Sequence, residues 1–168
     1  MFYVLHGEEE FIRSEQVNAL KARIARDGLG DLNVVVLDGT KVTYEELVHA
    51  CDTVPFLGDR RLIIVENLLQ RLEPKGRRTR GGRGSRRKRK RPASAKKKGA
   101  GSEAAAGPDS AYVERLVEYL PHLPPTTRLV FVESRSLPKG HPVLRCAEQT
   151  EGGYVKEYAR LGARRAQE

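Results

Sequence analysis

The sequence offers few of the residue patterns from which catalytic and metal centres are built. Its two cysteines, Cys51 and Cys146, lie far apart in the chain, so neither a redox pair nor a zinc knuckle is indicated. The four histidines show no spacing typical of metal ligands, and no Gly-x-Ser-x-Gly or comparable nucleophile motif occurs. We therefore expect no catalytic residue, no metal site and no cofactor.

Long apolar runs are also missing. No run approaches the roughly 20 residues that a transmembrane helix needs, and the apolar start of the chain turns after Leu5 into Gly7 and three glutamates, unlike a signal peptide. We expect a cytoplasmic protein with no membrane partner. A length of 168 residues is enough for one domain with its own core.

Positive charge is abundant but confined to one segment. The net charge is +9, yet residues 75–98 hold 14 Lys and Arg and no acidic residue, and the rest of the chain has 17 basic against 22 acidic residues. The part of the chain that can build a core is therefore acidic. Any affinity for nucleic acid must come from the basic segment alone.

The segment from Glu73 to Ser110 is rich in Arg, Lys, Gly, Ala and Ser and has no large apolar residue. Such a composition cannot bury enough surface to offset the entropy of ordering it, so we predict a disordered insert. Two interpretations stay open: non-specific contact with DNA phosphates, or a solvated linker without function. Because the insert has no aromatic residue, base stacking is excluded. The candidate phosphate contacts are Arg86, Arg87, Lys88, Arg89, Lys90 and Arg91.

Around this insert, short apolar runs alternate with helical patterns. We predict strands at residues 2–5, 33–37, 61–66, 128–133 and 154–158, and helices at 8–28, 43–53, 113–120 and 142–147. Thr43 and Glu46 form a capping-box pattern that predicts the start of the second helix. The run Val34-Val35-Val36 predicts a strand buried on both faces. The alternation indicates an α/β fold in which helices flank a five-stranded parallel sheet.

The turn after the first strand is where a nucleotide-binding fold holds phosphate. A working phosphate loop needs several glycines and a lysine, whereas this turn offers Gly7 followed by Glu8, Glu9 and Glu10. We predict a degenerate loop that binds no nucleotide, in which the glutamates favour helix initiation. Glu66 and Glu133 end two predicted strands, and we expect both to be solvated.

The connection Thr53-Val54-Pro55-Phe56-Leu57-Gly58 is unusually apolar for a loop. One interpretation places Val54, Phe56 and Leu57 under the sheet edge as an extension of the core, and the residues alone favour it. The alternative is an exposed wedge that inserts into a pocket of a partner protein.

Three stretches resemble the delta subunit of bacterial DNA polymerase III: FYVLHGEEEF, HACDTVPFLGDRRLIIVENLL and LPPTTRLVFVESRSLPKGHPVLR. The resemblance implies an AAA+-like domain of the P-loop NTPase type with a degenerate phosphate loop. It also implies a clamp-loader subunit, without intrinsic activity, within a DNA-directed DNA polymerase complex. Its partner would be the beta sliding clamp, which a hydrophobic wedge opens, and the wedge falls on Val54, Phe56 and Leu57.

From this resemblance we expect residues 1–158 to form the N-terminal AAA+-like domain, interrupted by the insert 73–110. We expect residues 159–168 to be a truncated tail that begins a missing lid domain. Assembly with other clamp-loader subunits is expected only for a full-length form. Two other functions stay open at this point. The chain could be an AAA+ or P-loop NTPase with an unconventional nucleotide site, or a basic nucleic-acid-binding protein.

Overall fold

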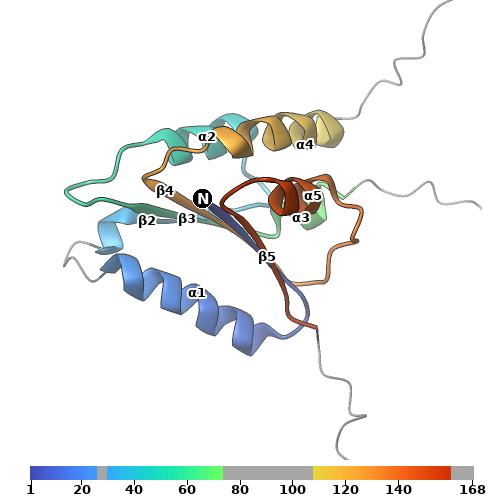
Figure 1. Ribbon diagram of the computed structural model, residues 1–168, viewed down its shortest axis with the longest axis horizontal. Coiled ribbons are helices and arrows are strands. Elements are labelled where there is room, and N and C mark those ends of the chain that lie inside the picture. The colour runs from blue at the N-terminus through green and yellow to red at the C-terminus, as the bar shows by residue number, and fades with distance from the viewer. Residues whose placement is uncertain (26–29, 74–107, 160–168) are drawn as a thin grey trace, which may run out of the picture.

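A single five-stranded sheet organises the protein, as a computed structural model shows (Figure 1). Its order is β2-β3-β4-β1-β5 and all neighbouring strands pair in parallel. The strands are β1 (Phe2–His6), β2 (Val34–Asp38), β3 (Arg61–Glu66), β4 (Thr127–Glu133) and β5 (Gly153–Glu157). The predicted α/β fold and its five strands are confirmed.

The structure describes residues 1–25, 30–73 and 108–159. The expected end of the first helix at Gly28, most of the predicted insert and the tail after residue 159 lie outside these ranges. At the end of the insert, helix α4 (Pro108–Tyr119) starts earlier than predicted. The last three residues of the segment 73–110 therefore belong to this helix.

Helices cover both faces of the sheet. One face packs against α1 (Glu10–Ala25), and the other carries α2 (Tyr44–Asp52), α3 (Leu68–Arg71), α4 and α5 (Pro142–Gln149) (Figure 1). Two short 3₁₀ helices, η1 (Gly30–Asn33) and η2 (Leu120–His122), complete the described elements. Alternate strand residues divide between two cores, with Ile63, Val65 and Phe131 on the four-helix side and Leu62, Ile64 and Val130 on the α1 side.

Strand β2 departs from its prediction. It lies at the edge of the sheet, pairs only with β3, and leaves Val36 52% exposed. The expected burial on both faces is wrong because a run of valines records strand propensity but not the position of the strand in the sheet.

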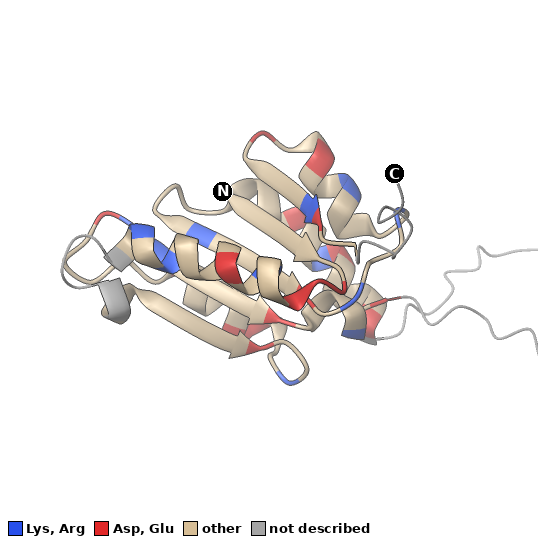
Figure 2. Ribbon diagram, turned by 90° about the horizontal axis from the view of Figure 1, so that it is seen from below, with Lys and Arg blue, Asp and Glu red and all other residues tan. Residues whose placement is uncertain are grey.

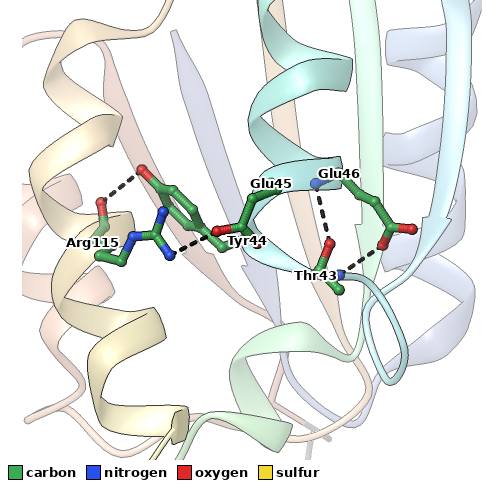
Figure 3. A network of polar contacts seen from close by, with 5 residues as sticks. All are labelled: Thr43, Tyr44, Glu45, Glu46 and Arg115. Carbon is green, nitrogen blue, oxygen red and sulfur yellow. Dashed lines mark hydrogen bonds and ion pairs between the residues drawn. The ribbon is translucent and has the colours of Figure 1, made fainter.

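The start of α2 agrees with the predicted capping box (Figure 3). The Glu46 amide donates to Thr43 Oγ1 at 3.2 Å, and the Thr43 amide donates to the Glu46 carboxylate at 2.8 Å. Next to this cap, Arg115 of α4 forms a 2.8 Å ion pair with Glu45 and lies over the Tyr44 ring. These exposed contacts join α2 to α4 but contribute little to stability.

The environment of Glu133 contradicts a second prediction. Glu66 is exposed as expected, but Glu133 is fully buried, and its carboxylate accepts hydrogen bonds from the amides of Leu69 at 2.8 Å and Gln70 at 3.1 Å. These amides belong to the first turn of α3, a helix that the sequence patterns did not predict. Glu133 therefore anchors α3 onto the sheet instead of facing solvent.

Burial raises the pKa of Glu133 to about 7 from an ordinary value of 4.5, although the two amide bonds oppose the shift. Because the folded state holds this proton more tightly than the unfolded state, the contribution of Glu133 to stability is full below pH 4.5 and declines as the pH rises to about 7. We predict that the unfolding free energy of the wild type falls relative to that of Glu133→Gln across this window, by at most about 3 kcal/mol.

Chemical denaturation of both proteins between pH 4 and pH 8 measures this difference. Taking the difference also removes the contributions of His6 and His141, whose pKa values are lowered by burial and which act in the opposite direction. A difference that stays constant across the window would contradict the prediction.

Candidate functional site

The loop between α2 and β3 exposes three apolar side chains. Val54 is 78%, Phe56 55% and Leu57 74% exposed to solvent. Their interpretation as an extension of the core is therefore wrong. Apolar side chains that gather on an exposed loop are typical of an interaction site.

This loop lies at the amino-terminal edge of the sheet. It leads directly into β3, just as η1 leads into β2, and Figure 1 shows it projecting beyond the end of the sheet. The turn after β1, where a phosphate would be expected, lies at the opposite edge because all strands are parallel. The two candidate sites from the sequence are therefore separated by the length of the strands.

Hydrogen bonds fix the end of the helix that precedes the loop. The Thr53 amide and hydroxyl both donate to the His49 carbonyl, at 3.1 and 2.6 Å, and close the last turn of α2. The buried Thr127 hydroxyl donates to the Cys51 carbonyl at 2.6 Å. Cys51 itself is fully buried, and burial raises the pKa of its thiol to about 12, so it serves as an uncharged core residue.

A residue that the sequence patterns missed holds the loop itself. The Asn33 side chain accepts a hydrogen bond from the Phe56 amide at 2.6 Å and donates one to the Phe56 carbonyl at 2.9 Å. Leu57 follows with a positive φ of 46°, which is uncommon for a residue other than glycine. No local motif marks Asn33, because its partner is 23 positions away.

Two backbone amides of the turn after β1 form hydrogen bonds within the protein. The Gly7 amide donates to the Arg135 carbonyl at 3.2 Å, and the Glu9 amide donates to the Tyr158 carbonyl at 3.1 Å. Gly7 has a φ of 129°, and a Cβ atom at this position would overlap the backbone of Tyr158. The glycine therefore permits close approach of the chain after β5, and these two amides are not free to bind an anion.

Acidic residues lie at the ends of strands along the same edge of the sheet (Figure 2). Three strands end there in an exposed acidic residue, namely Asp38, Glu66 and Glu157, whereas Glu133 at the end of β4 is buried and has a pKa raised to about 7. Glu8, Glu9 and Glu10 add to this charge. Within residues 1–25, 30–73 and 108–159, no group of three or more His, Cys, Asp or Glu side chains is arranged to hold a metal ion.

The buried histidines have structural partners. His6 Nδ1 accepts a hydrogen bond from the Leu137 amide at 3.2 Å, and His141 Nδ1 caps α5 by accepting from the Val143 amide at 3.2 Å. Among the residues that the structure describes, no helix is long and apolar enough to cross a membrane. The candidate phosphate contacts from Arg86 to Arg91 lie outside the described ranges.

Comparisons with known proteins point to one family. The model of the family described as DNA polymerase III, delta subunit, matches residues 3–78. The DNA polymerase III subunit delta of Bacillus subtilis (strain 168) is 31% identical over 65 residues, which make up 39% of this chain and 19% of that protein. In the solved structure of a Bacillus subtilis DNA clamp loader delta protein, the match has a TM-score of 0.64 at 20% identity and covers 95% of this chain and 38% of that one. The chain thus spans well under half the length of these proteins.

The occupied amides and the acidic strand ends predict that the domain does not bind nucleotide. Titration of the protein with Mg-ATP by isothermal calorimetry is expected to give no saturable heat. Because the carboxylates repel phosphate most strongly at low ionic strength, the experiment is most stringent when repeated in high salt. Saturable binding in the micromolar range under either condition would contradict this interpretation of the turn.

Proposed function

We propose that this chain is a clamp-loader subunit that binds and opens the beta sliding clamp during DNA replication. The match of residues 3–78 to the model of the DNA polymerase III delta-subunit family and the similarity of the fold to a clamp loader delta protein support this proposal. The observation that carries the proposal is the apolar loop of Val54, Phe56 and Leu57, exposed on a backbone that hydrogen bonds hold in place. In this proposal the loop is the wedge that the resemblance to the delta subunit implies.

Burial drives the proposed interaction. Phe56 and Leu57 are both more than half exposed in the free domain, so a matching apolar pocket on the clamp would remove a large apolar area from water. Buried aromatic and aliphatic anchors of this kind typically contribute about 2 kcal/mol or more each to binding.

Opening of the ring follows from differential binding. A protein shifts a conformational equilibrium only by as much as it binds one state more tightly than the other. A wedge that fits a pocket near the interface between clamp subunits, and fits it better when that interface is parted, therefore stabilises the open ring. The domain does this without chemistry of its own, so it acts as a binding component of the polymerase complex and not as an enzyme.

The alternative of an unconventional NTPase has less support. The turn after β1 has two of its amides occupied by protein carbonyls, and the acidic strand ends disfavour a phosphate group. Assembly with other clamp-loader subunits is part of the proposal for a full-length form.

We predict that Phe56→Ala combined with Leu57→Ala leaves the domain folded and weakens clamp binding by at least about a hundredfold. Both side chains are exposed, so little core packing is lost. Thermal unfolding and surface plasmon resonance against the beta clamp of the same organism measure the two effects on the same protein.

Phe11→Ala is the matched control, because Phe11 is a second exposed phenylalanine, 71% accessible, on α1. This variant is expected to bind the clamp like the wild type. A folded double variant with wild-type affinity would exclude the loop as the wedge. If the loop were instead core, truncation of Phe56 would destabilise the domain by roughly 3–5 kcal/mol.

The basic segment supports an additional role in holding DNA. Its 14 cations within residues 75–98 are accompanied by no acidic residue, whereas the remainder of the chain is acidic. We propose non-specific contacts from Arg86, Arg87, Lys88, Arg89, Lys90 and Arg91 to DNA phosphates, because binding of this kind depends on the number of cations and not on base sequence.

Replacement of residues 74–107 by a short Gly-Ser linker tests this role. A short linker can join the ends because Arg71 and Asp109 line one surface pocket. We predict a nearly unchanged melting temperature, loss of DNA retention at low salt, and unchanged clamp affinity. The wild type should lose retention as salt rises, with a slope in log-log form of about −0.7 to −0.9 per phosphate contacted.

Retention of DNA by the shortened chain would assign binding to the folded part instead. A large fall in melting temperature would mean that the replaced segment packs against the domain.

A further inference from the structure

Asn33 joins the exposed loop to the folded body of the protein through side-chain hydrogen bonds. We infer that its side chain positions the wedge, so that Asn33 sets clamp affinity without touching the clamp. The inference rests on the proposed function and adds a residue to it. Asn33 is only 3% exposed and lies at the end of η1, directly before β2.

Both polar atoms of the Asn33 side-chain amide form hydrogen bonds with one residue of the loop. Oδ1 accepts from the Phe56 amide at 2.6 Å, and Nδ2 donates to the Phe56 carbonyl at 2.9 Å. This pair of bonds fixes the peptide groups on either side of Phe56. The Phe56 side chain remains 55% exposed, so the bonds orient the loop without adding that side chain to the core.

The backbone beside this pair of bonds is in a disfavoured conformation. Leu57 has a φ of 46°, in the left-handed region that L-residues seldom adopt. A residue keeps such a conformation only where its surroundings impose it. The two hydrogen bonds to Phe56, the preceding residue, supply such a constraint. In this conformation the Leu57 side chain is 74% exposed.

Gly58 completes the arrangement from the other side of Leu57. A Cβ atom at Gly58 would lie 3.0 Å from Asn33 Nδ2, closer than most real contacts of a Cβ atom. The glycine therefore leaves room for the Asn33 amide. Each residue of Phe56-Leu57-Gly58 therefore has its own role. Phe56 forms the hydrogen bonds to Asn33, Leu57 has the disfavoured φ, and Gly58 leaves space for the Asn33 amide.

Preorganisation explains why this matters for binding. A loop that is already held in its binding geometry loses less conformational entropy when it meets a partner. Without Asn33 the two apolar side chains would still be present, but they would sample many orientations before docking. Removal of the Asn33 amide is therefore expected to weaken clamp binding on the order of tenfold.

The experiment uses the full 168-residue chain and three variants: Asn33→Ala, Asn33→Asp and Gly58→Ala. The first readout is hydrogen exchange at the Phe56 amide, measured by NMR on the free protein. Protection should be highest in the wild type, intermediate in Asn33→Asp, which keeps the acceptor but not the donor, and lowest in Asn33→Ala. Gly58→Ala should also lower protection, because its methyl group displaces the asparagine amide.

The second readout is affinity for the beta clamp, measured in a double-mutant cycle. Asn33→Ala should weaken binding in the wild-type background and have no further effect when Phe56 and Leu57 are already alanine. The matched control is Thr43→Ala, which removes the cap at the other end of α2. It should lower the melting temperature while Phe56 protection and clamp affinity stay unchanged.

The outcomes separate this inference from the proposed function. Unchanged Phe56 protection in Asn33→Ala would overturn the inference, whatever the clamp measurement gives. Lost protection with unchanged clamp affinity would also overturn it, while the proposed function would stand if the Phe56 and Leu57 double variant fails to bind. A double variant that binds like the wild type would overturn both.

Discussion

All five strands run in the same direction, and this constraint governs what each end of the molecule can do. Every loop that leads into a strand lies at one edge of the sheet, and every loop that follows a strand lies at the other. The apolar loop precedes β3 and so lies at the amino-terminal edge. The exposed acidic residues that end β2, β3 and β5 lie along the opposite edge. The loop that we propose to bind the clamp and the exposed acidic strand ends are therefore at opposite edges of the sheet.

At the carboxyl-terminal edge, polar groups of the chain form hydrogen bonds with one another. The Gly7 and Glu9 amides bond to carbonyls of the chain, Glu133 accepts two amides of α3, and His6 accepts the amide of Leu137. In a nucleotide-binding protein, groups at this edge would be free for the ligand. Here they stabilise the connections between elements.

The amino-terminal edge shows the opposite balance. Three apolar side chains remain in water at a cost in solvation free energy, while the backbone that carries them is fixed by Asn33 and by the cap at Thr53. Exposure of Phe56 and Leu57 is unfavourable for the free domain but leaves their full apolar area for a partner. A fixed backbone reduces the entropy lost on docking. Both effects serve the wedge that we propose for the clamp.

The sequence by itself determined the alternation of strands and helices, the capping box of Thr43 and Glu46, and the α/β class, because these depend on residues near one another in the chain. Only the tertiary structure decided that Val36 lies on an edge strand, that Glu133 is buried beneath α3, and that Phe56 and Leu57 are exposed. The hydrogen bonds between Asn33 and Phe56 also depend on the tertiary structure. Strand order and contacts between distant segments are set by how the elements pack together, and residue patterns carry no direct record of that packing.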